Sequence, residues 1–373
     1  MRMKSEKKII ESLLKCTGIT INGKNDFDIQ IHNEDVYARV LQQGALGLGE
    51  SYMDGWWDCR DLDQFFERVL NSNLHLKIED KWGVLIGLAK SFILNSGKKS
   101  KAFKIGEVHY DIGNDLYEAM LDKRLVYTCG YWSESKNLNE AQEAKLDLVC
   151  KKIGLKKGQT VLDIGSGWGS FIKFAAEKYG ARATGVTVSK EQKKLADELC
   201  KGLTAETELL DYRDINEKYD HVVSLGMFEH VGYKNYRKFM KIAHNSLSDD
   251  GLFLLHTIGG NTSTTGVDPW MDKYIFPGGM IPSIKQISKS IEKLFVMEDW
   301  HNLSTDYDKT LMEWHRNFEK NWDKIKPNYD ERFYRMWRYY LLLCAASFRV
   351  RDNQLWQIVL SKKGVPGGYK SIR

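Results

Sequence analysis

The chain has 373 residues, of which 42% are hydrophobic, 12% aromatic and 28% charged, and its formal net charge is +5. This composition is typical of an ordered globular protein and excludes a long disordered chain. The length exceeds what one hydrophobic core usually serves, so we expect two domains of unequal size. The net charge is too small to indicate a nucleic acid partner by itself, but it is compatible with attraction to an anionic membrane surface.

Cysteine usage and hydropathy indicate the compartment. The six cysteines are scattered and include no C-x-x-C pair, so neither a zinc site nor a disulfide framework is predicted. The N-terminal sequence MRMKSEKKII lacks the apolar core and cleavage site of a signal peptide. No run of about 18 or more apolar residues is present, which argues against a membrane-spanning helix. We therefore expect a cytoplasmic protein without a bound metal, whose membrane contact is peripheral.

The N-terminal part of the chain has the pattern of a small mixed module. Apolar spacing predicts two helices and one short strand, at 9–16 and 35–43 and at 29–32. Glycines in the next stretch are expected to loosen the backbone before Tyr52, Trp56 and Trp57, and an amphipathic helix is expected from Asp61. We interpret the aromatic cluster as hydrophobic core rather than as a site.

A second amphipathic pattern leads into a basic stretch. Apolar residues recur at helical spacing between Lys81 and Leu94, and a run of lysines follows, Lys98, Lys99, Lys101 and Lys104. Two interpretations stay open: a helix that packs on its own domain with a solvated connector, or a helix and lysines that contact a membrane surface. The composition of this stretch predicts a first domain at 1–95, a linker at 96–106 and a second domain at 107–373.

From Gln159 onward, apolar strand patterns alternate with helical patterns, which indicates a parallel α/β sheet. Helices are predicted at 171–179 and 190–203, and a helical region is inserted before the last two strands. The predicted strands number seven and lie at 160–165, 183–188, 206–211, 220–227, 252–258, 295–302 and 355–363.

The strongest single motif is the sequence VLDIGSGWG at 161–169, a buried strand that runs into a glycine-rich turn and a helix. Glycines let a ligand approach the end of the strand closely and allow backbone angles that other residues avoid. The spacing differs from the dinucleotide pattern G-x-G-x-x-G, which makes a nicotinamide enzyme a poorer interpretation. The motif resembles motif I of Rossmann-like methyltransferases, in which an acidic residue and glycines hold S-adenosylmethionine.

Polar residues follow the next strands as well. Ser189 is a predicted N-cap in the segment 187–192, and the segment 211–214 follows the third strand. Glu229 and His256 come at the ends of the fourth and fifth strands and are candidates for moving a proton. Each has a plainer interpretation, helix capping or structural hydrogen bonding, and His230 is assigned a structural role. Because open α/β sheets bind ligands at the carboxyl ends of their strands, we expect all these segments to face one crevice.

At this point the sequence resembles the bacterial cyclopropane-fatty-acyl-phospholipid synthases, relatives of the mycolic acid cyclopropane synthases. The resemblance spans nearly the whole chain in the strings GLGESYMDGWWDC, EVHYDIGNDLY, YTCGYW, VLDIGSGWG, SLGMFEHVG, LLHTIG, VDPWMDKYIFPGG, MEDWHN and LWQIVLSK. It implies a small mixed α+β N-terminal domain that binds lipid and an α/β, Rossmann-like class I methyltransferase domain with a mostly parallel seven-stranded sheet. It also implies transfer of a methylene from S-adenosylmethionine to the cis double bond of a phospholipid acyl chain, and a homodimer.

The same resemblance implies the site residues. Bicarbonate would act as general base, bound by Cys129, Glu229, His256, Ile258 and Tyr307. Cys344 matches a cysteine proposed as a nucleophile in relatives, but its apolar helix favours a buried structural thiol. The implied contacts to S-adenosylmethionine are Tyr127, Thr128, Asp163, Gly165, Gly167, Trp168, Gly169, Thr187, Ser189, Gln192, Tyr212 and Arg213. Ser166 stands where the family often has cysteine, a swap of similar size.

The mechanism needs an aromatic, water-poor lining to stabilise a carbocation on the acyl chain. Candidates for this lining are Tyr127, Tyr131, Trp132, Tyr274 and Phe276. Alternatives stay open: a fatty acid or small-molecule methyltransferase of the same architecture, and a catalytically silent protein that binds S-adenosylmethionine. A nucleic acid methyltransferase is disfavoured because no N-P-P-[YF] motif and no strongly basic domain are present.

Overall fold

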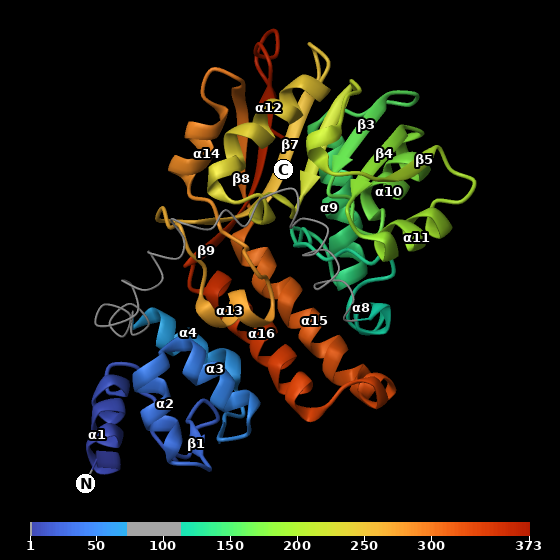
Figure 1. Cartoon of the computed structure of the whole chain (residues 1–373). Helices are drawn as coiled ribbons and strands as arrows, with labels where there is room; N and C mark the ends of the chain where they lie inside the picture. The colour runs from blue at the N-terminus through green and yellow to red at the C-terminus, as the bar shows by residue number, and fades with distance from the viewer. Residues whose placement is uncertain (1, 73–112) are drawn as a thin grey trace. The chain divides into compact units, whose positions relative to one another are not determined.

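A computed structural model of the chain describes residues 2–72 and 113–373 (Figure 1). By its internal contacts the chain divides into two compact units, each of which is described by itself. The first unit is drawn from 1–94, 265–277 and 307–353, and the second from 95–264, 278–306 and 354–373. The predicted helix at 81–94, the lysine run and the linker at 96–106 lie outside the described residues.

The first unit begins with a mainly helical segment. Its elements are α1 (Arg2–Leu14), β1 (Gln30–Ile31), α2 (Asp35–Gln43), α3 (Ala45–Met53), β2 (Trp57–Asp58) and α4 (Leu62–Asn71). The predicted helices, the strand and the helix after Asp61 are confirmed, and β1 pairs with β2 in antiparallel fashion. Tyr52 and Trp57 are 1% and 0% exposed, which agrees with their interpretation as core.

The expectation of a loosened, glycine-rich backbone before Tyr52 is wrong, because this stretch forms the helix α3. Its glycines serve close packing. A Cβ on Gly47 would lie 2.5 Å from the carbonyl oxygen of Arg39, and one on Gly49 would lie 2.4 Å from the Trp270 ring. The helix tolerates the low propensity of glycine because neighbouring groups occupy the space that side chains would fill.

Among the described residues, three later α-helices also belong to the first unit: α13 (Pro269–Tyr274), most of α15 (Ser304–Ile325) and α16 (Glu331–Arg349). α16 packs against α3 and α4, and α13 packs against α3. The Tyr339 ring lies 4.8 Å from Phe66 and 4.5 Å from Trp270, measured between ring centroids. The compact unit is therefore larger than the segment 1–95 expected from the sequence, since helices distant in the chain share its core.

The second unit is built on a seven-stranded sheet with the order β5-β4-β3-β6-β7-β9-β8. β3 to β7 pair in parallel, whereas β8 and β9 are antiparallel to each other, so the predicted mostly parallel sheet is confirmed. All seven predicted strands are present, as β3 (Thr160–Ile164), β4 (Arg182–Thr187), β5 (Ala205–Leu209), β6 (His221–Leu225), β7 (Leu252–Gly260), β8 (Val296–Asn302) and β9 (Asn353–Ser361).

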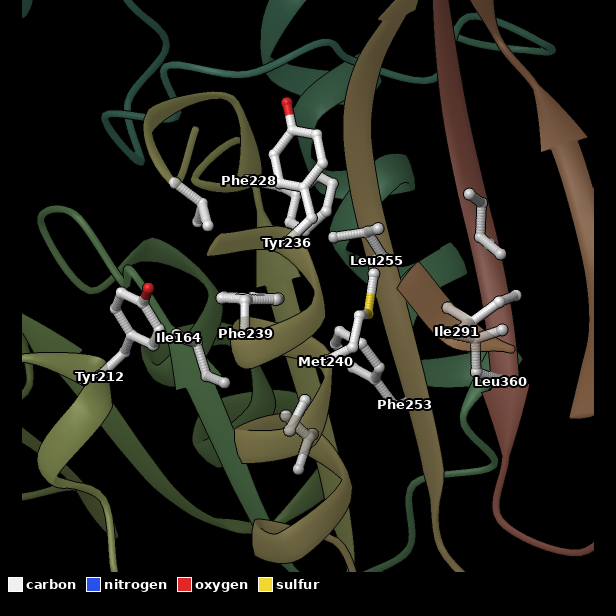
Figure 2. Close-up of a cluster of buried hydrophobic side chains, with 14 of the residues drawn as sticks. Ile164, Tyr212, Phe228, Tyr236, Phe239, Met240, Phe253, Leu255, Ile291 and Leu360 are labelled. Atoms are coloured by element: carbon white, nitrogen blue, oxygen red, sulfur yellow. The ribbon is translucent and has the colours of Figure 1, made fainter. Parts of the chain in front are cut away.

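A hydrophobic cluster lies against each face of this sheet. Successive residues of a strand point to opposite faces, so one strand can contribute to both clusters. In β7, Phe253 and Leu255 enter one hydrophobic cluster and Leu254 enters the other. Figure 2 shows the first cluster, in which Phe239 and Ile291 come from the helices on that face. The helices that contribute to the two clusters are α12 (Tyr236–Ser246) and α14 (Ile284–Ile291) on one face, and α9 (Leu138–Lys152) and α10 (Ser170–Tyr179) on the other.

The helices that follow the first two strands also match the sequence prediction. α10 begins directly after the glycine-rich turn and packs on β3 and β4. α11 (Lys190–Leu199) follows β4 and packs on β4 and β5. Within the described ranges, no helix combines the length and the apolar character that crossing a membrane requires. The arrangement leaves the carboxyl ends of five parallel strands at one edge of the sheet (Figure 1).

One close contact in the sheet can be tested by substitution. A Cβ on Gly259 in β7 would lie 2.0 Å from the Trp356 ring of β9, and Trp356 is 2% exposed. We expect Gly259→Ala to lower the free energy of unfolding by about 1 to 3 kcal/mol, because the buried ring cannot retreat. Urea unfolding measures this change.

Gly266→Ala is the matched control, because a Cβ there would meet no atom within 4 Å. Its unfolding midpoint should stay close to that of the parent protein. A Gly259→Ala variant as stable as the parent would contradict the tight packing described for β7 and β9.

Candidate active site

The glycine-rich turn follows β3 directly. Gly165, Gly167 and Gly169 all have positive φ angles, of 87°, 54° and 80°. A Cβ on Gly165 would also lie 2.6 Å from the Cβ of Met227, so the turn requires glycine there for space as well as for conformation. The turn after β3 thus places three glycines, which carry no side chain, at this edge of the sheet.

Asp163 lies inside β3, one residue before its end, and is 2% exposed. Its Oδ1 atom has no hydrogen-bond partner among the described residues. Burial raises the pKa of this carboxyl group to about 7, and the charge of Lys145 opposes the shift. A buried carboxyl oxygen without a partner is costly, which suggests that a ligand completes its bonding.

The turn between β4 and α11 is held by three polar side chains. Ser189 is the N-cap of α11, and its hydroxyl accepts from the amide of Gln192 at 3.2 Å, which confirms the predicted cap. The Thr187 hydroxyl donates to Oε1 of Gln192 at 2.7 Å and accepts from the amide of Ser189 at 3.2 Å. These bonds hold the turn in one conformation at the same edge of the sheet.

The segment after β5 is also held by local contacts. Asp211 accepts from Nε and Nη2 of Arg213 at 2.7 and 2.6 Å, a bidentate pair, and from the Arg213 amide at 3.0 Å. The Tyr212 ring is 7% exposed and packs against Phe239 at 5.4 Å, as Figure 2 shows. This segment follows the edge strand β5, which pairs with β4.

The segment before α9 lies next to β6. A Cβ on Gly226 would be 2.6 Å from Cγ2 of Thr128, so Thr128 lies against the end of that strand. Cys129 is fully buried, and its Sγ lies 3.1 Å from the carbonyl oxygen of Gly130. The ring of Tyr117 contacts Tyr127 at 5.2 Å and Trp168 at 4.8 Å, so Trp168 packs with aromatic residues of this region.

Glu229 lies in a short 3-10 helix, η2 (Phe228–His230), just after β6. Its Oε1 accepts from the amide of Ile258 in β7 at 2.5 Å, whereas its buried Oε2 has no partner among the described residues. Burial raises the pKa of Glu229 to about 7, partly offset by the bonds from Ile258 and Thr257. The carboxyl group is therefore held in place and exchanges a proton near neutral pH.

His256 lies in β7 and is 1% exposed. Burial, with the charges of Lys145 and Lys152, holds its pKa well below the ordinary value, so the imidazole is neutral. The Gln357 amide nitrogen lies 3.3 Å from Nδ1. The imidazole carries its proton on Nε2 when this nitrogen donates to Nδ1, and on Nδ1 when the amide presents its oxygen instead. Nε2 has no partner among the described residues and is therefore available to a ligand.

The structure brings part of the predicted site together. Glu229 and Ile258 share a hydrogen bond, and the amide of Gly226 donates to the carbonyl oxygen of His256 at 2.9 Å. Thr128 contacts Gly226, which places the adjacent Cys129 close to the same strand ends. Four of the five residues predicted for bicarbonate thus belong to the second unit.

Other predicted residues belong to the first unit, and their relation to Glu229 stays a prediction. Tyr307 packs there against Trp314 and Phe348, at 5.9 and 4.6 Å between ring centroids. Cys344 is partly buried, and burial raises the pKa of its thiol to about 12, which favours a structural thiol over a nucleophile. Of the predicted aromatic lining, Tyr274 and Phe276 also fall in this unit.

Sequence reasoning missed three buried polar residues of the site region. Gln357 bonds His256, and Gln142 and Lys145 of α9 bond Thr128. A weak signal exists for Gln357, which is the one polar residue of the run LWQIVL, whereas Gln142 and Lys145 lie in the mixed sequence AQEAKLDLV and give no such signal. The part of the chain that the structure describes contains no group of three or more His, Cys, Asp or Glu side chains that could hold a metal ion.

Comparisons with known proteins agree with this geometry. The family model described as mycolic acid cyclopropane synthetase matches residues 97–358. A cyclopropane-fatty-acyl-phospholipid synthase of Escherichia coli (strain K12) is 49% identical over 366 residues, which is 98% of this chain and 96% of that protein. The tuberculostearic acid methyltransferase UfaA1 of Mycobacterium tuberculosis is 32% identical over 359 residues, covering 90% of this chain and 83% of that protein.

A solved structure supports the same assignment. The mycolic acid cyclopropane synthase CmaA1, complexed with SAH and CTAB, matches with a TM-score of 0.65 and 32% identity, covering 70% of this chain and 98% of that chain. The class I methyltransferase fold expected from the sequence is thereby confirmed. With the fold, the strand-end residues and the match over most of its length in agreement, this chain belongs to the mycolic acid cyclopropane synthetase family.

Proposed function

We propose that this protein is an S-adenosylmethionine-dependent cyclopropane-fatty-acyl-phospholipid synthase. It adds a methylene across the cis double bond of an unsaturated phospholipid acyl chain and releases S-adenosylhomocysteine. The observation that carries the proposal is the pair Glu229, just after β6, and His256, within β7 opposite the last residue of β6, each with one buried polar atom that lacks a partner among the described residues. The 49% identity to the Escherichia coli synthase supports the same reaction.

The cofactor side of the proposal rests on the turn after β3. Glycines with positive φ leave the backbone open to a ligand, and the unpartnered Oδ1 of Asp163 can accept a bond from it. The segments around Thr187 and Tyr212 follow β4 and β5 at the same edge. The related CmaA1 is complexed with SAH, the product that methyl transfer from S-adenosylmethionine leaves.

The chemistry begins with an isolated alkene, which is a weak nucleophile. The alkene attacks the sulfonium methyl, a carbon–carbon bond forms, the carbon–sulfur bond breaks, and positive charge develops on the neighbouring chain carbon. Positioning in near-attack geometry supplies much of the rate. Tyr127, Tyr131 and Trp132 of the second unit are proposed to stabilise that charge through their ring quadrupoles and to exclude water.

Ring closure then requires loss of a proton from the new methyl group. The unpartnered atoms of Glu229 and His256 fit a small oxyanion, because His256 Nε2 donates and the Glu229 carboxyl group both accepts and, when protonated, donates. Bicarbonate, when bound there, would supply the general base for this proton. We propose that Glu229 and His256 hold it, with Cys129, Ile258 and Tyr307 as the remaining ligands implied by the family resemblance.

Ile258 has a more specific part in this proposal. Its amide already donates to Oε1 of Glu229 at 2.5 Å, so it orients the carboxyl group toward the ligand. We propose the equivalent part for Gln357, whose amide nitrogen as a donor to Nδ1 of His256 keeps the proton on Nε2. Both groups are thus prepared before the substrate arrives, which is how polar sites avoid reorganisation during the reaction.

A second candidate function is methylation without ring closure. The tuberculostearic acid methyltransferase UfaA1 covers 90% of this chain at 32% identity, and its name describes a methyl transfer to a fatty acid. We rank it second because the Escherichia coli synthase is the more similar of the two proteins at 49% identity. The two functions differ in their product, so one assay separates them.

The lipid substrate implies work at a bilayer surface. We propose peripheral association of the protein with an anionic membrane, and a homodimer, both on the basis of the family resemblance. The candidate membrane contacts Lys98, Lys99, Lys101 and Lys104 lie outside the described residues, so their part rests on the sequence alone. Each lysine near such a surface contributes about 1 kcal/mol.

The principal test uses the protein with S-adenosylmethionine, bicarbonate and vesicles of cis-unsaturated phospholipid. Mass spectrometry should detect acyl chains heavier by one methylene with cyclopropane fragmentation. Glu229→Gln should lower the rate about 100-fold or more, because the base is no longer held, while S-adenosylhomocysteine binding stays near the parent value. Glu208→Gln, an exposed carboxylate in β5, is the matched control and should keep parent activity.

Product identity decides between the candidates. Methyl-branched chains from the parent protein would favour the methyltransferase function. Unchanged chains, with the cofactor bound, would contradict both functions.

The raised pKa of Glu229 predicts a pH dependence of stability. Folding shifts this pKa from its ordinary value of 4.5 to about 7, so between these values the folded state binds more protons than the unfolded state. Stability from this group is therefore full below pH 4.5 and is lost as pH rises to about 7. The free energy of unfolding of Glu229→Gln relative to the parent should rise across this window by up to about 3 kcal/mol.

Urea unfolding of both proteins from pH 4 to 8 measures this difference. Below the window the carboxyl group is protonated in both states, which gives an internal reference. A difference that does not change with pH would show that Glu229 is not desolvated as described.

The membrane proposal has its own test. Charge reversal at Lys98, Lys99, Lys101 and Lys104 should weaken sedimentation with anionic vesicles by more than 10-fold at low salt, because about 1 kcal/mol per lysine is lost. Vesicles of neutral lipid serve as the control and should show little change. Equal binding of parent and variant to anionic vesicles would contradict a part for these lysines.

A further inference from the structure

One face of α9 holds Thr128 and Tyr131 through three hydrogen bonds. Nζ of Lys145 donates to the Thr128 hydroxyl at 2.8 Å, and Nε2 of Gln142 donates to the Thr128 carbonyl oxygen at 2.8 Å. The amide of Tyr131 donates to the carbonyl oxygen of Ala141 at 2.8 Å. Side chain and backbone of Thr128 are therefore both held from the same helix face.

The two donors are buried deeply. Lys145 is 1% exposed and Gln142 is fully buried. Burial lowers the pKa of Lys145 to about 8, and the carboxyl groups of Asp122 and Asp163 favour its charged form. A buried ammonium is costly in free energy, and an apolar side chain of similar size would fill this position of the core at lower cost. The free-energy cost of burying this ammonium suggests that Lys145 does more than fill space in the core.

Thr128 connects α9 to the residues that follow β6. Its Cγ2 lies against Gly226, and the amide of Gly226 donates to the carbonyl oxygen of His256 at 2.9 Å. The Lys145 ammonium interacts electrostatically with Asp163 at the cofactor turn and with His256. Movement of Thr128 would therefore disturb Gly226 and the part of β7 that bears His256. It would also break the hydrogen bond that holds the Lys145 ammonium, whose charge acts on Asp163.

We propose that Lys145 and Gln142 are positioning residues that hold Thr128 in the conformation in which it contacts S-adenosylmethionine. Lys145 acts through the hydroxyl of Thr128 and Gln142 through its carbonyl oxygen, and neither touches the reacting atoms. This inference rests on the proposed function, because the contact of Thr128 with the cofactor comes from the family resemblance. It predicts that the two donors affect cofactor binding rather than lipid binding.

The experiment is a double-mutant cycle on the full chain, with Lys145→Met, Thr128→Val and the combined variant. Calorimetry measures the Kd for S-adenosylhomocysteine, and initial rates give KM for S-adenosylmethionine and for phospholipid. We expect Lys145→Met to raise Kd about 10- to 100-fold, as loss of a charged hydrogen bond does, with KM for phospholipid unchanged. The combined variant should bind no more weakly than the weaker single variant, since both remove one interaction.

Lys152→Met is the matched control. Lys152 belongs to the same helix and is fully buried, but its Nζ contacts Nδ1 of His301 at 2.9 Å rather than Thr128. It tests the general cost of removing a buried ammonium from α9. Its Kd for S-adenosylhomocysteine should stay within about 3-fold of the parent value.

Gln142→Met is a second probe if Lys145→Met does not fold, because it removes the carbonyl bond and keeps the ammonium. We expect it to raise Kd about 3- to 10-fold. Folded Gln142→Met and Thr128→Val variants with parent Kd values would overturn the inference, as would additive effects in the cycle. Both results leave the proposed function intact if the parent makes cyclopropane chains, whereas a parent that binds no S-adenosylhomocysteine overturns the function and the inference together.

Discussion

The hydrogen bond from the amide of Ile258 to the carboxyl group of Glu229 is the interaction on which the candidate site depends. It joins the short helix η2 after β6 to β7 at 2.5 Å and fixes one carboxyl oxygen, while the other is buried without a partner among the described residues. The bond is possible because the parallel pairing of these strands sets Leu225 opposite His256. Glu229, which follows β6, is thereby brought beside Ile258 in β7.

Buried polar groups gather where the parallel strands β3 and β6 end beside β7. Asp163, Glu229 and His256 each retain one buried atom without a partner among the described residues. Such groups lower stability unless a ligand completes their bonding. His221 and Thr207 also carry an unpartnered buried atom elsewhere in the sheet, so the support for the proposed location of the reaction is that three such groups lie on or just after the neighbouring strands β3, β6 and β7.

Rigidity at this edge comes from neighbours distant in sequence. The aromatic and apolar cluster in Figure 2 holds Tyr212 and Phe228 on one face of the sheet. On the other side, α9 holds Thr128 through Gln142 and Lys145. A site that must orient a weak nucleophile benefits from such support, because small displacements cost large factors in rate. The hydrophobic cluster and the hydrogen bonds from α9 therefore both hold residues of the candidate site in place.

The sequence by itself determined the seven strands of the second unit and the two helices that follow β3 and β4, because apolar alternation and glycine turns are local signals. It also identified Glu229, His256 and the turn at Gly165, since these follow predicted strands. Only the tertiary structure decided that α16 joins the first unit, that Ile258 bonds Glu229, and that Lys145 is buried against Thr128. These features depend on contacts between residues far apart in the chain, and local pattern has no information about which distant groups meet.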